Sequence, residues 1–188
     1  MGPTRLRDTA LTYVMVVGLC CSLLTSCADA NRIVEPEPPD SLSDLFGPVL
    51  FRADGSAVGT ETIEDKAVVA IYFAARACPA CGAFTPVLIN FYDQVRQDEK
   101  SFEVVLVSLE ASAQEMFAYM TDYAMPWLAV PFDSDEATAL PQRYGVRWIP
   151  TLIVVDGEGK TISINGVDDI YGLGDGAYNA WLARSGGQ

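Results

Sequence analysis

Three runs of apolar, largely β-branched residues dominate the hydrophobic pattern of this chain. They are "AVVAIYFA" at residues 67–74, "FEVVLVSL" at 102–109 and "TLIVVD" at 151–156. A short run of this kind, without polar alternation, is typical of a strand buried on both faces of a sheet. The turn sequence "DGEGK" follows the third run and predicts that "TISIN" (161–165) returns as its antiparallel partner.

Between and after these runs, apolar residues recur at helical spacing. Phe84, Leu88 and Val95 fall on one face of an amphipathic helix predicted over residues 79–97. Shorter helices are predicted for three further segments, at about 112–123, 135–144 and 176–183. The glycines at 172, 174 and 176 miss the spacing of a dinucleotide-binding motif and are interpreted as a loop before the last helix. The order of elements predicts an α/β fold, with a central mixed β-sheet flanked by helices on both faces.

The first 26 residues have the pattern of an export signal. Arg5 and Arg7 precede an apolar run of about 15 residues, which is too short for a good membrane-spanning helix. The run ends in "LLTSC", which resembles the lipobox of bacterial lipoproteins and predicts that Cys27 is lipidated and becomes the N-terminus. An ordinary signal peptide cleaved nearby, or an uncleaved anchor, is the alternative.

This pattern divides the chain into a lipoprotein signal peptide at 1–26, a lipidated tether at 27–44 and a globular domain at 45–188. The tether is polar and rich in proline and acidic residues, a composition that favours an extended chain. We therefore expect an extracytoplasmic protein, lipid-anchored to a bacterial membrane and facing the periplasm or the cell surface.

The net charge narrows the range of partners. The chain has 12 Lys and Arg against 25 Asp and Glu, a formal net charge of −13. This charge argues against binding to nucleic acid and against electrostatic docking on anionic lipid. The 188 residues suffice for one domain with a sizeable core, which we expect to act as a monomer.

Only one pair of cysteines is expected to keep free thiols. Of the five cysteines, Cys20 and Cys21 leave with the signal peptide and Cys27 becomes a thioether. Cys78 and Cys81 remain, in the motif "CPAC". The motif follows the first buried strand, at the point where the long helix is predicted to begin.

Three interpretations of this pair compete. A structural zinc site needs four ligands, usually Cys or His, and the chain has no histidine and no third free cysteine. We therefore expect no metal and no other cofactor, although a metal-handling thiol pair stays an alternative. A static disulfide would close too short a loop to remove much unfolded-state entropy. A redox pair fits the placement best, since backbone N–H groups and the helix dipole stabilise a thiolate at a helix start.

Several stretches occur in the order of a known family over roughly residues 45–165. They are "LFGPVLFRADGS", "FTPVLINFYDQV", "FEVVLVSLE", "MPWLAVPF" and "YGVRWIPTLIVVDGEGK". With the strand–CxxC–helix unit, they resemble the thioredoxin fold family in its tryparedoxin and nucleoredoxin branch. The resemblance implies a thioredoxin-like domain at 45–188 in which Cys78 attacks a substrate disulfide and Cys81 resolves the mixed disulfide.

The resemblance also implies the residues that meet the substrate. Ile149 and Pro150 match the family's cis-proline segment, which packs beside the cysteines. Other implied substrate contacts flank the two motifs and are Ala77, Pro79, Ala80 and Trp148. The expected partners are protein disulfides or dithiols and an unidentified membrane protein that donates electrons.

The chain departs from the family at three places. Ala77 replaces the usual Trp before the first cysteine, Pro79-Ala80 replaces Pro-Pro, and Tyr72 stands where thioredoxins proper carry a buried acid. Glu110 is interpreted either as a replacement carboxylate or as a solvated residue at a strand end. The prediction is a membrane-anchored thiol–disulfide oxidoreductase that reduces protein substrates. The alternative is a non-catalytic lipoprotein binding module on the same scaffold, with a static disulfide.

Overall fold

The structure, a computed structural model, describes residues 39 and 41–186. The signal peptide, Cys27 and the greater part of the predicted tether lie outside the described residues. Among the residues that are described, no helix is long and apolar enough to cross a membrane.

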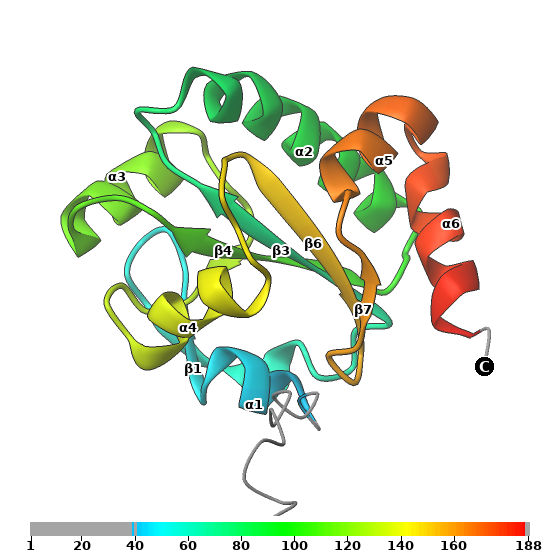
Figure 1. The fold of residues 1–188 in the computed structure, drawn as a ribbon, viewed down its shortest axis with the longest axis horizontal. Coiled ribbons are helices and arrows are strands. Elements are labelled where there is room, and N and C mark those ends of the chain that lie inside the picture. The colour runs from blue at the N-terminus through cyan, green and yellow to red at the C-terminus, as the bar shows by residue number, and fades with distance from the viewer. Residues whose placement is uncertain (1–38, 40, 187–188) are drawn as a thin grey trace, which may run out of the picture. The chain divides into compact units, whose positions relative to one another are not determined.

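A seven-stranded mixed sheet forms the centre of the described domain (Figure 1), in the order β2-β1-β5-β4-β3-β6-β7. The strands are β1 (Val49–Phe51), β2 (Ala57–Gly59), β3 (Val68–Ala74), β4 (Phe102–Ser108), β5 (Leu128–Ala129), β6 (Thr151–Asp156) and β7 (Thr161–Ser163). Strand β3 pairs in parallel with β4 and antiparallel with β6. These three central strands are the three apolar runs, and helices on both faces explain why the runs lack polar alternation.

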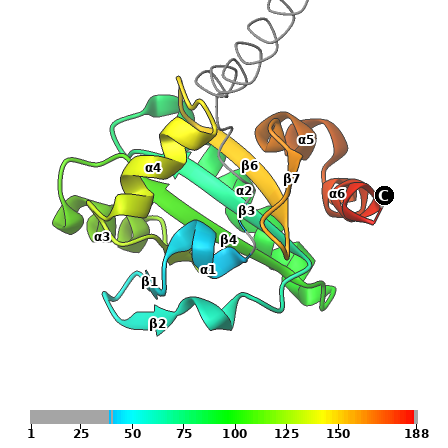
Figure 2. The same cartoon turned by 60° about the horizontal axis from the view of Figure 1, so that its bottom comes forward.

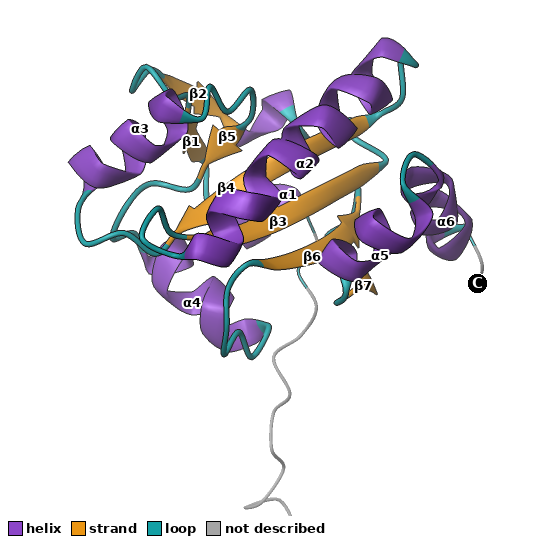
Figure 3. Cartoon of the chain, turned by 90° about the horizontal axis from the view of Figure 1, so that it is seen from above, coloured by secondary structure: helices purple, strands orange, loops and turns teal. Residues whose placement is uncertain are grey.

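Helices cover both faces of this sheet. They are α1 (Leu42–Phe46), the short 3-10 turn η1 (Thr60–Thr62), α2 (Pro79–Gln97), α3 (Ala113–Asp122), α4 (Asp135–Arg143), α5 (Gly166–Leu173) and α6 (Gly176–Ser185). Figure 2 shows α1 and α4 in front of the sheet, and Figure 3 shows α2 lying across the opposite face.

Successive residues of β3 supply two separate cores. Ala70 and Tyr72 pack with buried residues of α2, α3, α5 and α6. Val69 and Ile71 pack with buried residues of α1 and α4. Because side chains alternate across a strand, one apolar run serves both layers.

The predicted fold class is confirmed, and the predicted strands and helices agree with the structure to within two residues at each end. Two expectations are corrected. Gly172 lies inside α5 rather than in a loop, because Ile170 of this helix is buried in the core. Leu42 of α1 is also buried, so the folded part begins before residue 45.

The pairing of β3 with β6 defines two ends of the domain. Phe73 lies opposite Thr151 at the end where α2 begins, and Val68 lies opposite Asp156 at the other end. The turn after Asp156 contacts the beginning of the described chain, since a Cβ added at Gly159 would lie 2.8 Å from the ring of Pro39. The N-terminal segment therefore enters the domain at the end opposite to the "CPAC" motif.

Candidate active site

Cys78 lies at the junction between β3 and α2. It is the N-cap of α2, with extended backbone angles, and Pro79 follows at the first helical position. Proline suits this position because the first N–H groups of a helix have no intrahelical partner. Cys78 is half-buried, in contrast to Cys81, which is buried.

Backbone groups from two elements hold the sulfur of Cys78. Its Sγ atom accepts a hydrogen bond from the N–H of Cys81 at 3.2 Å, and its thiol donates to the carbonyl oxygen of Ile149 at 3.5 Å. The first contact is an N-cap bond, which together with the positive end of the helix favours negative charge on the sulfur. The second contact joins the start of α2 to the segment before β6.

Cys81 differs sharply from Cys78 in its surroundings. Its side chain is fully buried, beneath the first turn of α2. Burial, and next the hydrogen bond with Cys78, raise the pKa of the Cys81 thiol. Cys81 is therefore protonated and shielded, whereas Cys78 is only half-buried, so the two thiols differ in accessibility as the predicted division into an attacking and a resolving sulfur requires.

Three buried hydroxyl groups lie next to Cys81, from Tyr72, Thr85 and Tyr119. The Oγ1 atom of Thr85 donates to the carbonyl oxygen of Cys81 at 2.8 Å and lies 2.9 Å from the hydroxyl oxygens of Tyr72 and Tyr119. Because a hydroxyl has one proton to donate and two lone pairs, both tyrosines donate to Thr85. Burial raises the pKa of both tyrosines, so the cluster is neutral.

The segment before β6 completes the surroundings of Cys78. The Ile149–Pro150 bond is cis, as the family resemblance implies. Trp148 leaves 74% of its surface exposed. The remaining predicted substrate contacts flank Cys78 in sequence and are exposed; they are Ala77, Pro79 and Ala80. The structure thus places the predicted residues on accessible surface around one sulfur, and their role in substrate binding stays a prediction.

A family model described as thioredoxin-like matches residues 65–161, from just before β3 to the first residue of β7. The chain belongs to the thioredoxin-like family.

Within the thioredoxin-like family, the chain is similar to nucleoredoxins and tryparedoxins. Nucleoredoxin from Bos taurus is 34% identical over 146 residues, which are 77% of this chain and 33% of that protein. The chain therefore spans about a third of the length of the curated nucleoredoxins it matches. The branch predicted from the sequence is confirmed.

Solved structures agree with this placement in the family. Tryparedoxin from Trypanosoma brucei has a TM-score of 0.66 and 33% identity, covering 74% of this chain and 96% of the other. Thioredoxin from Wuchereria bancrofti has a TM-score of 0.63 and 38% identity, with the same coverage of 74% and 96%. In both comparisons the sequence identity is above 30%, and the match covers nearly the whole of the other protein.

In this thioredoxin-like chain, Glu110 is hydrogen-bonded to the loop before the cysteines. Its Oε1 atom accepts a hydrogen bond from the backbone N–H of Arg76, and the guanidinium of Arg76 pairs with Asp122. The carboxylate thereby fixes the backbone two residues before Cys78. This contact assigns Glu110 a positioning role that neither sequence interpretation had included.

Sequence reasoning missed Thr85 and Tyr119, which join Tyr72 beside Cys81. Thr85 carried a signal, because it is a polar residue on the apolar face of α2, one turn after Cys81. Tyr119 carried none, since an aromatic residue at helical spacing reads as core. Among the described residues, no group of three or more His, Cys, Asp and Glu side chains could hold a metal ion.

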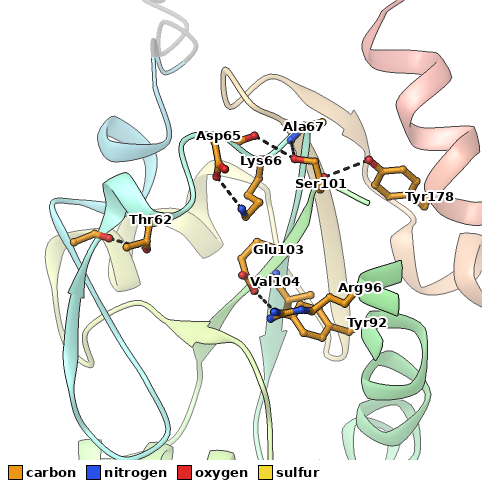
Figure 4. A network of polar contacts seen from close by, with 11 residues as sticks. Thr62, Asp65, Lys66, Ala67, Tyr92, Arg96, Ser101, Glu103, Val104 and Tyr178 are labelled. Atoms are coloured by element: carbon orange, nitrogen blue, oxygen red, sulfur yellow. Dashed lines mark hydrogen bonds and ion pairs between the residues drawn. The ribbon is translucent and has the colours of Figure 1, made fainter. Parts of the chain in front are cut away.

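A second polar network lies at the opposite end of the thioredoxin-like domain, around the start of β4 (Figure 4). Glu103 accepts hydrogen bonds at Oε1 from the hydroxyl of Tyr92 at 2.9 Å and the N–H of Val104 at 3.0 Å. A cavity of about 350 Å³ opens beside it, between Lys66 and Arg96. Burial raises the pKa of Glu103 despite these contacts and nearby cations. The network supports the packing of α2 on β4, away from the cysteines.

Proposed function

We propose that this chain, a thiol–disulfide oxidoreductase of thioredoxin type, reduces disulfides of polypeptide substrates from a lipid anchor outside the cytoplasm. One observation carries the chemistry. An accessible Cys78 caps α2, and a fully buried Cys81 follows three residues later, with its N–H on the sulfur of Cys78. Such a pair allows one sulfur to attack and the other to follow.

The first exchange uses the Cys78 thiolate. It attacks one sulfur of the substrate disulfide, so that the substrate S–S bond breaks and a disulfide forms between Cys78 and the substrate. The departing substrate thiolate takes up a proton. The N–H of Cys81 and the start of α2 stabilise the thiolate before attack.

The second exchange releases the substrate. Cys81 loses its proton and attacks the Sγ atom of Cys78, which breaks the mixed disulfide and frees the second substrate thiolate to take up a proton. The substrate has then gained two electrons and two protons, and Cys78 and Cys81 form a disulfide. A dithiol of a membrane protein returns two electrons and two protons and becomes a disulfide in turn.

The residues between the cysteines favour the reducing direction. A strong oxidant stabilises the thiolate of its reduced form heavily. Pro79 and Ala80 carry no charge that would add such stabilisation. The neutral hydroxyl cluster of Tyr72, Thr85 and Tyr119 likewise supplies no cation beside the pair.

The anchored location is supported by the sequence. The motif "LLTSC" follows an apolar run directly, and the residues between Cys27 and the domain are rich in proline and acid. A lipid on Cys27 would hold the domain at a membrane surface without a spanning helix. The dithiol donor would then be met at the same membrane.

The test is the turnover of insulin reduction with dithiothreitol as donor, together with the reduction potential of the pair against glutathione. We expect turnover in the wild type, none in Cys78→Ser, and accumulation of a mixed disulfide in Cys81→Ser. Absence of turnover with a potential below about −300 mV would instead support a binding module with a static disulfide.

A further inference from the structure

A small pocket opens beside the reactive sulfur, on the other side of Pro150. Trp148 and Pro150 line it from the segment before β6, and Ile164, Val167 and Asp168 line it from the end of β7 and the start of α5. The pocket is adjacent to the sulfur, since the carbonyl oxygen of Ile149 lies 3.5 Å from the Sγ atom of Cys78. Trp148 and Pro150, which line the pocket, flank Ile149 in the chain, so a substrate joined to Cys78 is held close to it.

The size of the pocket suits one side chain. Its volume is about 130 Å³, whereas sites for small molecules usually measure about 300–1,000 Å³. A free small-molecule substrate would leave most of its surface outside. A side chain from a polypeptide already held at Cys78 needs no larger space.

The walls of the pocket are mixed: Trp148, Pro150, Leu152, Ile164 and Val167 are apolar, and Thr151, Asn165 and Asp168 are polar. Trp148 and Ile164 leave 74% and 64% of their surfaces accessible, the two largest values among the large hydrophobic residues described. Single exposed apolar residues are common, but two that line one pocket next to a reaction centre indicate a contact surface. The walls therefore suit a long aliphatic or aromatic portion of a side chain.

The mouth of the pocket carries a negative charge. The exposed side chain of Asp168 makes no hydrogen bond or ion pair with another described residue. Its neighbour Asp169 is already engaged, since its Oδ2 atom accepts from Ser163 and Trp181. Arg147 precedes Trp148 in the chain but does not line the pocket. Asp168 is thus the charge that an incoming side chain meets.

We propose that this pocket binds an arginine or lysine side chain of the polypeptide substrate, close to the disulfide that Cys78 attacks. The aliphatic stem packs on Ile164 and Val167, the cation lies over the ring of Trp148, and its N–H groups reach the carboxylate of Asp168. The net charge of −13 draws cationic segments toward the surface. This inference rests on the proposed reductase function and names its preferred substrates.

The test uses short peptides joined as disulfide-linked dimers, with one residue beside the cysteine varied among arginine, norleucine and glutamate. The varied residue is placed in turn on either side of the cysteine. Reduced full-length protein is mixed with each peptide, and the released peptide thiol is measured after an acid quench. Each rate is divided by the rate of reduction by dithiothreitol, because a nearby cation also makes the leaving thiol more reactive.

We expect arginine to raise the normalised second-order rate constant about tenfold over norleucine at its best position, and glutamate to lower it. Asp168→Asn lowers the ratio of arginine to norleucine severalfold, leaving the contribution of Trp148, and added salt lowers it in the wild type. Trp148→Leu slows both peptides. Asp175→Asn is the matched control, since Asp175 is an exposed acid outside the pocket, and it keeps the wild-type ratio.

Two contrary outcomes are distinguishable. If peptides and insulin are reduced but the ratio is the same in the wild type and in a folded Asp168→Asn variant, this pocket is not a substrate subsite and the reductase function stands. If the wild type reduces neither the peptides nor insulin, the proposed function fails and the subsite fails with it. Circular dichroism of each variant establishes that it is folded.

Discussion

Thr85 lies one turn after Cys81 in α2, and its hydroxyl donates a hydrogen bond to the carbonyl oxygen of Cys81 at 2.8 Å. Its two lone pairs accept from Tyr72 of β3 and Tyr119 of α3. One small side chain therefore satisfies groups from three elements directly beside Cys81. In this thioredoxin-like chain a neutral cluster occupies the region where thioredoxins proper carry a buried acid.

Thr85→Val removes the shared partner and should destabilise the reduced protein by about 1–3 kcal/mol, because two buried tyrosine hydroxyls lose their acceptor. Tyr72→Phe should cost less, about 1 kcal/mol, since it removes one donor and strands no other group. Urea unfolding followed by fluorescence measures both. Thr138→Val, at an exposed position of α4, is the control and should change stability by less than about 0.5 kcal/mol. Equal effects at all three positions would contradict a special role for Thr85.

Alkylation should distinguish the two cysteines. Of the two cysteines in the motif, iodoacetamide should modify only Cys78 in the reduced native protein, because Cys81 is fully buried and its pKa is raised. Mass spectrometry after timed quenching measures the extent. Cys81→Ser should keep the fast reaction and Cys78→Ser should lose it until the protein is unfolded in urea. Equal rates at both thiols in the native protein would remove the basis for assigning attack to Cys78.

The buried carboxyl of Glu103 should make stability depend on pH. Its pKa in the folded state is raised by burial, so the unfolded chain loses the proton first as the pH rises. The contribution of the protonated group is complete below the unfolded pKa and is lost as the pH increases through the folded value. Glu103→Gln should therefore gain stability relative to the wild type as the pH rises above the ordinary glutamate pKa of about 4.3.

Urea unfolding across this pH range measures the gain, which should grow with pH. Glu158→Gln, in the exposed turn between β6 and β7, supplies the control with the same change of charge. A difference between Glu103→Gln and the wild type that stays constant with pH would show that the carboxyl does not titrate as proposed.

Restoring the aromatic ring before the first cysteine should alter selectivity. Ala77 is exposed beside Cys78, so Ala77→Trp should fold and retain exchange while changing the rates toward protein substrates several-fold relative to one another. Insulin and a second disulfide protein compared at equal concentration provide the readout. Ala139→Trp, on an exposed position of α4, is the matched control. Kinetics unchanged toward every substrate would show that the missing ring is irrelevant.

The lipid anchor is testable in a bacterial host. Cys27→Ser should lose incorporation of a labelled fatty acid and should move the protein from the membrane fraction to the soluble fraction, because the thioether is the proposed attachment. Immunoblotting of separated fractions measures the change. Cys21→Ser, within the predicted signal peptide, should leave labelling intact. Labelling that persists in Cys27→Ser would place the lipid elsewhere or exclude it.

The elements that sequence predicts well are those whose local pattern and tertiary role coincide. Strand β3 is apolar throughout because both faces are covered, and α2 starts where Pro79 follows an N-cap. The short helix α5 is not predicted from the sequence, because Gly166 and Gly172 lower its helix propensity. Its stability comes from Ile170 in the core and from Asp169, which bonds Ser163 and Trp181.

The residues of the site also differ in how well the sequence predicts them. The cysteines and the cis-proline segment carry recognisable motifs, whereas the hydroxyl cluster depends on α3 packing on the same face of the sheet as α2, which brings Tyr119 to Thr85 and Tyr72. The pocket at Asp168 depends on the end of β7 lying beside Pro150. Such contacts form only in the tertiary fold, so no local sequence pattern predicts them.

The entry of the chain beside Gly159 has a consequence for how an anchored molecule works. Pro39 and Cys78 lie at opposite ends of the central sheet, and β6 alone is about 20 Å long. If Cys27 carries the proposed lipid, its tether therefore joins the domain at the end remote from the sulfur of Cys78. A substrate or a dithiol donor could then approach Cys78 without meeting the point at which the tether joins the domain.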